Sequence, residues 1–393
     1  MKITGIRQYK FSVPTGSPAV DVESGSTYGS ASKPWLLLKV TTDAGIDGWG
    51  EGTGEWLVDS VEATLTSWTE LLIGRDPLMT RAITEDIVNR IPWKGGPVFG
   101  TAIAAISMAL FDITGKAWNV PVHTLLGGKC RDRVRVYEGK LAFESVEQSV
   151  NSARSAAERG FAGVKGNPLE FRTWPMDATS IEHCTSCVKA VRDTMGDAFD
   201  IMLDCHGSPT PELALQFAQE VAPYRPLFLE EPLKTGSLEA LQYVTQRSPV
   251  PVAVGEKLFS REQFQLLIDR RACSFLQPDL SHAFGIPTML DISRAAELQQ
   301  MLMAPHVAGG PLMYAATLHV DAVTPNFLIQ ETNYFDQFGL CVEHDLQIQE
   351  GYVNVSEAPG LGVRVKEQDL EKLRYEALPF RQYRHSDGSW KGW

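Results

Sequence analysis

The chain has 393 residues, of which 44% are hydrophobic, and its formal net charge is -12 at pH 7. This acidic balance and the lack of a dense Lys/Arg tract disfavour a nucleic acid or an anionic membrane as a partner. No stretch reaches the roughly 18 uninterrupted apolar residues of a membrane span, and the N-terminus lacks the apolar core of a secretion signal. We therefore expect a soluble, cytoplasmic protein.

The N-terminal part of the chain predicts a hairpin followed by helices. Alternating residues 1–11 and the segment 33–51, with a turn at residues 43–45, are typical of antiparallel strands. Residues 14–32 are rich in Gly, Ser and Pro, and they fit either an ordinary surface loop or a lid that excludes water. The segment 98–119 is apolar on nearly all sides, which indicates a packed core helix.

The length of the chain predicts two domains. It exceeds the roughly 250 residues that a (β/α)-barrel needs alone, so we expect a second, smaller domain. Residues 1–125 are expected to form an α+β domain that the C-terminal tail, about 365–393, completes. Residues 126–364 are expected to form the barrel.

Short apolar segments recur along the second domain. Most are too short and too apolar for amphipathic helices, so buried parallel strands fit them better. A helix is expected near residues 180–194, between the second and third strands. The predicted strands cover residues 134–139, 161–168, 201–204, 226–232, 251–257, 275–280, 301–306 and 326–331.

Acidic or basic residues recur at the ends of the later strands. Their spacing is 26, 26, 23, 27 and 25 residues, about the length of one strand, one helix and two loops. Any one of them could merely cap the following helix, but the whole series indicates an active site at the mouth of a barrel. The series is Asp204, Glu230, Glu256, Asp279, His306 and Glu331.

The first three residues of this series predict a metal site. Asp204, Glu230 and Glu256 supply hard oxygen ligands, which suit Mg²⁺. Glu231 follows Glu230 directly, and we expect it to point away from the mouth because side chains alternate along a strand. Cys184 with the nearby Cys187 has a zinc-like spacing, but no second pair completes four ligands, so we expect free thiols and no zinc.

Further polar residues fit acid and base roles. Asp279 could orient His306 as a general base, although His306 taken alone would be read as a structural histidine. His206 lies two residues after Asp204, so in extended backbone both side chains leave the same face. Lys165 and Asn167 share this spacing, and Lys165 either contacts a carboxylate or is a solvated surface lysine.

Several further motifs are Trp49-Gly50-Glu51, the core helix, Glu230-Glu231-Pro232, Gly255-Glu256 and residues 277–285, 304–306 and 359–363. Taken together, they make the chain resemble the enolase superfamily, and within it the mandelate racemase subgroup, over nearly its whole length. The resemblance implies an α+β capping domain and a modified TIM barrel of the (β/α)7β type. It also implies a Mg²⁺ held by Asp204, Glu230 and Glu256, a base made of His306 and Asp279, and an eighth-strand carboxylate, Glu331.

One departure from the racemase pattern narrows the resemblance. Many members carry Lys-x-Lys on the second strand, whereas this chain has Lys165-Gly166-Asn167 and so lacks the second base. Asn167 together with Asp204-Cys205-His206 is similar to the acid-sugar dehydratases, most closely those of the D-galactonate dehydratase type. The substrate implied is a small sugar acid, an aldonate or an aldarate.

The reaction that this resemblance implies is β-elimination of water to a 2-keto-3-deoxy acid. His306 removes the α-proton and His206, as imidazolium, protonates the departing β-hydroxyl. Glu331, protonated or bridged to a donor, hydrogen-bonds the substrate carboxylate, and Lys165 adds positive charge. Asn167, Lys165, His206 and Glu331 are then expected to contact the substrate.

Other readings of the same residues stay open. His206 could return a proton to the α-carbon, as a racemase or epimerase requires, and a lactonising cycloisomerase is a more distant option. A non-catalytic enolase-fold protein is a further reading, and the presence of every metal position and both histidines disfavours it. The family is usually oligomeric, so we expect a homo-oligomer.

Overall fold

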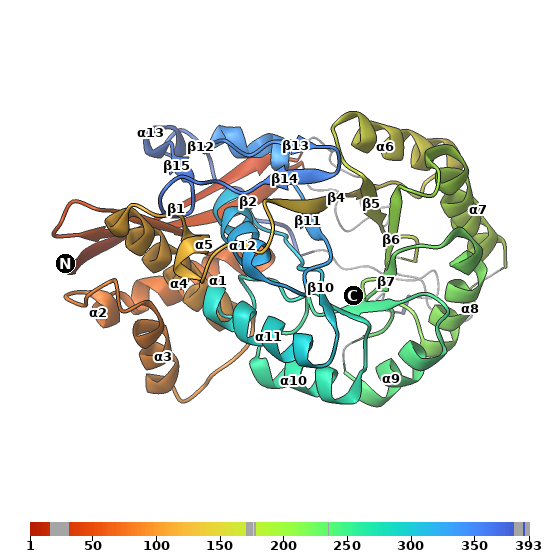
Figure 1. The fold of residues 1–393 in the computed structure, drawn as a ribbon, viewed down its shortest axis with the longest axis horizontal. Helices are drawn as coiled ribbons and strands as arrows, with labels where there is room; N and C mark the ends of the chain where they lie inside the picture. The colour runs from red at the N-terminus through yellow and green to blue at the C-terminus, as the bar shows by residue number, and fades with distance from the viewer. Residues whose placement is uncertain (16–30, 170–175, 177, 235, 381–387, 390–393) are drawn as a thin grey trace.

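The computed structural model describes residues 1–15, 31–169, 176, 178–234, 236–380 and 388–389. Most of the loop expected as a surface loop or lid, residues 16–30, therefore lies outside the described residues, and so does most of the tail beyond residue 380. Figure 1 shows the described chain as a helix-covered sheet on one side and a ring of strands and helices on the other.

The N-terminal sheet is antiparallel, in the order β1-β2-β3. Alternation along β2 sends its apolar side chains to two different cores. Leu36 and Leu38 pack with the helices of the N-terminal domain, whereas Trp35 and Leu37 join the larger core of the barrel side. The strands are β1 (Ile3–Pro14), β2 (Ser32–Thr42) and β3 (Gly48–Glu51).

The expected core helix is present as α4 (Pro97–Trp118). By length and composition it could cross a membrane, but 89% of its most apolar window is buried inside the protein, as in the core helix of a soluble protein. Gly50 of β3 lies so close to α4 that an added Cβ would collide with the backbone oxygen of Ala105. The other helices here are η2 (Glu55–Leu57), α1 (Val58–Ser67), α2 (Thr69–Leu72), α3 (Thr80–Arg90) and α5 (Val122–Leu125).

The barrel expected from the sequence is confirmed, with parallel strands from β4 to β11. The ring closes where β11 pairs with β4 and where Met303 bridges Phe327 in parallel. The strands are β4 (Arg133–Leu141), β5 (Gly163–Gly166), β6 (Asp200–Asp204), β7 (Phe228–Glu230), β8 (Val252–Val254), β9 (Phe275–Leu276), β10 (Leu302–Met303) and β11 (Gln330–Thr332).

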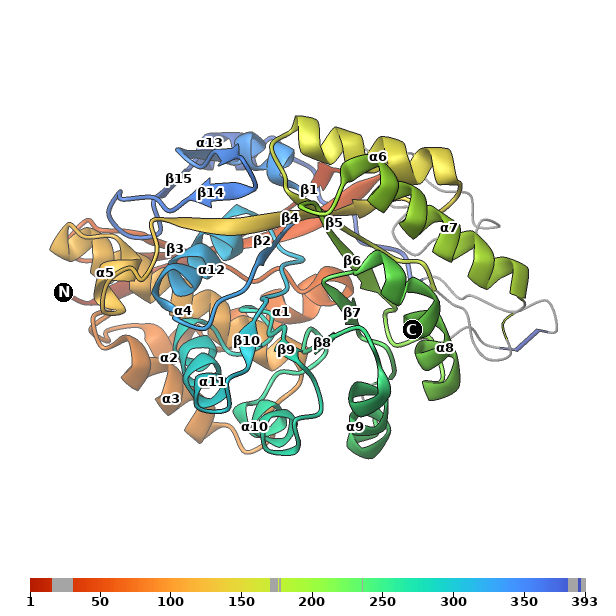
Figure 2. The ribbon, with the colours of Figure 1, turned by 45° about the vertical axis from the view of Figure 1, so that its right-hand side comes forward.

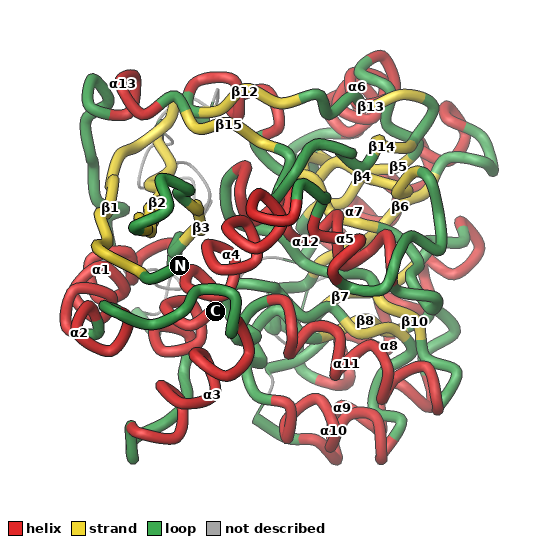
Figure 3. Tube along the Cα trace, turned by 60° about the vertical axis from the view of Figure 1, so that its left-hand side comes forward, coloured by secondary structure: helices red, strands yellow, loops and turns green. Residues whose placement is uncertain are grey.

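Helices connect these strands and lie outside the ring, as Figures 1 and 3 show, which gives the (β/α)7β order. Serine or threonine side chains cap the first turns of α6, α8, α9 and α10, satisfying backbone N–H groups there. The helices are α6 (Val146–Glu158), α7 (Ala178–Met195), α8 (Pro211–Val221), η3 (Ala222–Tyr224), α9 (Leu238–Arg247), α10 (Arg261–Arg270), α11 (Ile286–Leu298) and α12 (Pro311–Val323).

The chain after β11 returns to the N-terminal sheet (Figure 2). Ser12 donates its backbone N–H to the carbonyl of Arg374 at 2.9 Å, and Arg7 pairs with Glu371 at 2.8 Å. The domain boundaries near residues 125 and 365 stay predictions. The elements are η4 (Phe335–Leu340), β12 (Val342–His344), β13 (Ile348–Gln349), β14 (Tyr352–Asn354), β15 (Val363–Val365) and α13 (Glu367–Leu370).

Candidate active site

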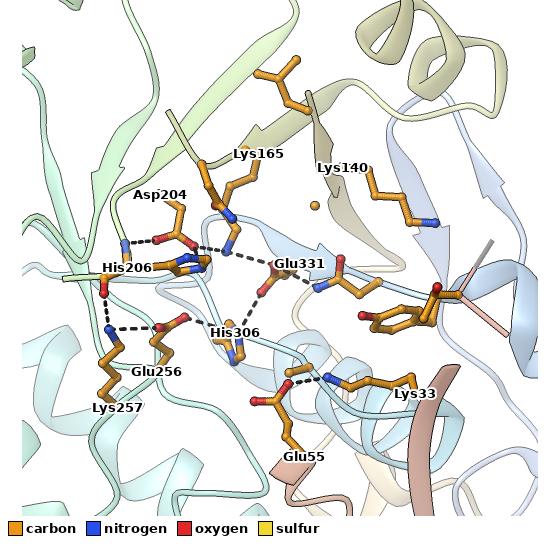
Figure 4. Close-up of a pocket in the computed structure, with 18 of the residues that line it drawn as sticks. Lys33, Glu55, Lys140, Lys165, Asp204, His206, Glu256, Lys257, His306 and Glu331 are labelled. Carbon is orange, nitrogen blue, oxygen red and sulfur yellow. Dashed lines mark hydrogen bonds and ion pairs between the residues drawn. The ribbon is translucent and has the colours of Figure 1, made fainter. Parts of the chain in front are cut away.

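A cavity of about 890 Å³ lies at the carboxyl ends of the barrel strands. Most residues of the expected series line it, together with residues of the N-terminal domain and of the loops after β4 and β5. Figure 4 shows ten of them labelled. The lining residues that bear on the chemistry are Lys33, Glu55, Lys140, Lys165, Asn167, Asp204, His206, Glu256, Lys257, His282, His306, Glu331, Asn333 and Tyr334.

Three carboxylates come together in this region. Asp204 and Glu230 are direct partners in the register of β6 and β7, and Glu256 follows the end of β8. One oxygen from each lies within 4.8 Å of the others, and all three residues are buried. The structure therefore brings the expected metal ligands together.

The charges around Glu230 show why a cation suits this site. Burial raises the pKa of Glu230 to about 8, and the carboxylates of Asp204, Glu331 and Glu256 add to the rise against the opposing charge of Lys165. Lys165 Nζ lies 2.6 Å from one oxygen of Glu230, and Gln277 Nε2 donates to the other at 2.6 Å. Crowded hard oxygens of this kind fit Mg²⁺.

His306 and Asp279 form a hydrogen-bonded pair. The Nδ1 atom of His306 lies 2.8 Å from Asp279 Oδ2, and its Nε2 lies 3.4 Å from Glu256 Oε2. Burial lowers the pKa of His306, but the negative charges of Glu331, Asp279 and Glu256 outweigh it and raise the pKa to about 10. Without a metal the imidazole is therefore held in its protonated form.

His206 contacts Asp204 through a tight turn. Its Nε2 lies 2.9 Å from Asp204 Oδ2, and its backbone N–H donates to Asp204 Oδ1 at 2.8 Å. The expectation of extended backbone here was wrong, because His206 has a φ of 49°. Lys257 Nζ donates to the His206 carbonyl at 2.6 Å and so helps to hold this left-handed turn.

Lys165 is a buried cation among acids, so the alternative of a solvated surface lysine was wrong. Its Nζ lies 2.9 Å from Glu331 Oε1, and Glu331 also accepts hydrogen bonds from the Val307 backbone at 3.1 Å and from Asn333 at 3.0 Å. Burial raises the pKa of Glu331, but Lys165 and His306 outweigh it and lower the pKa. Glu331 is thus ionised and bridged to donors.

Neither Glu231 nor the pair Cys184 and Cys187 belongs to the carboxylate triad. Glu231 is buried and accepts the Gly255 N–H at 3.0 Å, and it is not among the residues that line the cavity. Within the described residues, the carboxylate triad is the one group of His, Cys, Asp and Glu placed to hold a metal. Cys184 donates to the Pro168 carbonyl at 3.1 Å, which gives zinc no support.

Sequence reasoning missed several residues of the site. Gln277 and Asn333 stand two residues from Asp279 and Glu331, and this same i, i+2 spacing could have found them. Lys33 and Glu55 had no such signal, because they belong to the N-terminal domain and share no pattern with the barrel strands.

Known proteins share this architecture. Residues 148–369 match the family model described as "Enolase C-terminal domain-like", and residues 22–127 match "Mandelate racemase / muconate lactonizing enzyme, N-terminal domain". The chain is 33% identical over 369 residues to the D-galactonate dehydratase of Ralstonia pickettii (strain 12J), covering 91% of this chain and 96% of that protein. It is 34% identical over 377 residues to the D-galactonate dehydratase of Variovorax paradoxus (strain S110), covering 93% and 98%.

A solved structure also matches this chain over nearly its whole length. The crystal structure of an enolase from Agrobacterium radiobacter, with bound Na and L-malate, matches with a TM-score of 0.87 at 27% identity over 99% of both chains. The chain therefore belongs to the enolase superfamily. It is a sugar acid dehydratase, a hydro-lyase.

Proposed function

We propose that this dehydratase is Mg²⁺-dependent, that its substrate is an aldonate or a related acid, and that D-galactonate is the favoured one. The observation that carries the proposal is the pair of histidines at the carboxylate triad, His306 bonded to Asp279 and His206 bonded to Asp204. The similarity to D-galactonate dehydratases over 91% of the chain supports the choice of substrate.

Asp204, Glu230 and Glu256 would hold the metal ion. When bound, Mg²⁺ supplies positive charge that stabilises the anion building on the substrate carboxylate as the α-proton leaves. Lys165, buried against Glu230 and Glu331, supports the same charge from the protein side.

His306 is the proposed general base. Asp279 fixes its Nδ1, so that Nε2 faces the cavity and can accept the α-proton. To act as a base the ring must be neutral. Glu256 is one of the charges that raise the pKa of His306, so neutralising Glu256 lowers that pKa.

His206 is the proposed general acid. As the α C–H bond breaks, its electron pair forms the C=C bond and the β C–O bond breaks. The hydroxyl group leaves as water with the proton of the His206 imidazolium, and the resulting enol becomes a 2-keto-3-deoxy acid. Asp204, 2.9 Å from His206 Nε2, favours the charged ring.

Glu331 and Asn167 are proposed substrate contacts. Because Glu331 is ionised and held by Lys165 and Asn333, it serves as an acceptor for a substrate hydroxyl rather than as a donor to the carboxylate. Asn167 lines the cavity two residues beyond Lys165 and offers both a donor and an acceptor. A cytoplasmic location and a homo-oligomeric state stay predictions.

A panel of aldonic and aldaric acids tests the proposal. Purified protein is first treated with EDTA and then assayed for 2-keto-3-deoxy product with and without added Mg²⁺. Product from D-galactonate that appears only after Mg²⁺ is restored supports both the substrate and the metal. Turnover by the EDTA-treated protein at the full rate would show that the reaction does not need a metal ion.

A further inference from the structure

An ion pair from the N-terminal domain closes one side of the cavity. Lys33 on β2 and Glu55 at the start of η2 bond through Nζ and Oε1, and their side chains are 6% and 17% exposed. Tyr334 lies beside them, with its ring centre 5.5 Å from Lys33 Nζ. In the view of Figure 4, His306 lies between this pair and the carboxylates of Asp204 and Glu256. The proposed mechanism gives neither Lys33 nor Glu55 a role.

The described residues of the N-terminal domain bring balanced charge to the cavity. Those that line it are Thr15, Lys33, Glu55 and Pro97, hence one ammonium and one carboxylate. Burial raises the pKa of Glu55, but the charge of Lys33 outweighs it and the pKa is lowered, with further help from His282 and His306. The pair is therefore ionised, and Glu55 lies within electrostatic reach of the proposed base.

We infer that the Lys33–Glu55 pair binds the distal hydroxyl groups of the substrate and selects aldonates, with one carboxylate, against aldarates, with two. The inference rests on the proposed function, which puts the first carboxylate at the triad and the α-carbon next to His306. The rest of the carbon chain then lies between His306 and the wall that Lys33 and Glu55 form.

Hydrogen-bond chemistry favours a hydroxyl group at this wall. A hydroxyl group donates to the carboxylate of Glu55 and accepts from the ammonium of Lys33, so it satisfies both members of the pair. A second carboxylate has no proton to donate and would lie beside Glu55, where two like charges in a buried site repel each other. Lys33 cannot offset this repulsion, because Glu55 already neutralises its charge.

Lys140 is the group that could reverse the preference. It lines the cavity, its side chain is 39% exposed, and its ion-pair partner Glu138 is 4.0 Å away. A lysine held this loosely could receive the second carboxylate of an aldarate. The effect of replacing Lys33 or Glu55 on the preference must therefore be compared with the effect of replacing Lys140.

Pairs of acids that differ only at the far end test the selection, namely D-galactonate with galactarate and D-gluconate with D-glucarate. With Mg²⁺ present, the wild-type protein should show a kcat/KM for the aldonate at least about 10-fold above that for the aldarate. Glu55→Gln leaves Lys33 unpaired and positive, and it should move the ratio toward the aldarate by about 10-fold or more. Lys33→Met leaves Glu55 unpaired and negative, and it should move the ratio further toward the aldonate.

Glu367→Gln is the matched control. Glu367 pairs at 2.8 Å with Lys39, on the same strand as Lys33, but neither residue lines the cavity, so the ratio should not change. Misfolding lowers turnover of both acids together and cannot mimic opposite shifts in their ratio, and thermal melting reports on folding directly.

Two results would overturn the inference, and they are distinguishable. A wild-type preference for the aldarate that Lys140→Met removes would contradict the selection while the dehydratase assignment stands. If no acid of either class is dehydrated, the proposed function fails and the selection fails with it.

Discussion

His306 Nδ1 lies 2.8 Å from Asp279 Oδ2, across a parallel bridge that continues β9 and β10 beyond their ends. Strand pairing thus fixes the distance between the carboxylate and the imidazole. Because Asp279 is 1% exposed, water does not compete for this hydrogen bond, and the ring keeps one orientation toward the cavity.

Replacing Asp279 with Asn should lower kcat by at least about 100-fold with little change in KM, because the ring loses the acceptor that orients its base nitrogen. Steady-state kinetics on the accepted sugar acid measures both constants. Asp291→Asn is the control, because Asp291 forms surface ion pairs with Arg81 and Arg261 and should leave both constants unchanged. An unchanged kcat in Asp279→Asn would show that Asp279 does not orient the base His306.

Replacing His306 or His206 by Asn should affect different steps of the reaction. His306→Asn should lose both exchange of the α-proton with solvent and loss of water, because both begin at the base. His206→Asn should keep the exchange while dehydration falls by about 10² to 10⁴, the usual contribution of a general acid. Proton NMR in heavy water reads the two steps separately, and loss of exchange in His206→Asn would contradict these roles.

Glu51→Ala should lower the free energy of unfolding by roughly 3 kcal/mol or more, because it leaves buried donors without an acceptor. The Glu51 carboxylate accepts the N–H groups of Gly310, Leu312 at 3.1 Å and Met313 at 3.0 Å, and so binds β3 to the first turn of α12. Urea unfolding measures the loss.

Glu343→Ala is the control for this measurement. Glu343 forms an exposed ion pair with Arg364, so its loss should cost less than about 1 kcal/mol. Equal effects of the two substitutions would show that Glu51 does not connect the domains.

The metal-free protein should lose stability as the pH rises from 6.5 to 9. Burial lowers the pKa of His306, but the charge of Glu331 outweighs it, and the pKa rises from 6.5 to about 10. The contribution of His306 to the stability of the fold is therefore full below pH 6.5 and is lost toward pH 10. Burial raises the pKa of Glu230 from 4.5 to about 8, so its contribution is lost in the same direction. Asp204 and Glu331 have lowered pKa values, and their contributions are already complete above pH 4.5.

Thermal melting in EDTA and in Mg²⁺ at several pH values checks this prediction. Tm in EDTA should fall between pH 6.5 and 9. The rise in Tm caused by Mg²⁺ should grow over the same range, because the metal binds deprotonated carboxylates. A Tm in EDTA that is constant or rises with pH would contradict the assignment of these charges.

The barrel and much of its mouth could be predicted because strand–helix units have similar lengths. The regular steps from Asp204 to Glu331 reflect that repeat, and parallel strands bring their carboxyl ends to one face. Asp204 and Glu230 therefore become register partners, as the spacing indicates. The acidic triad could be predicted without any knowledge of side-chain packing.

Other features depend on contacts that no local pattern records. His206 adopts a left-handed conformation held by Asp204 and Lys257, and a short sequence motif does not fix that φ. The Lys33–Glu55 pair lies within the N-terminal domain, and it lines the cavity because that domain packs against the mouth of the barrel. Both residues are remote in sequence from every residue of the triad, so the periodicity of the barrel strands could not connect them with it.

Proton NMR of D-galactonate with purified protein and Mg²⁺ in heavy water tests directly whether the protein eliminates water from this acid. The proposed mechanism predicts a 2-keto-3-deoxy acid as the product, and no product in EDTA or with His306→Asn. Exchange of the α-proton or an epimeric acid, without loss of water, would contradict it and assign the site to a racemase or epimerase.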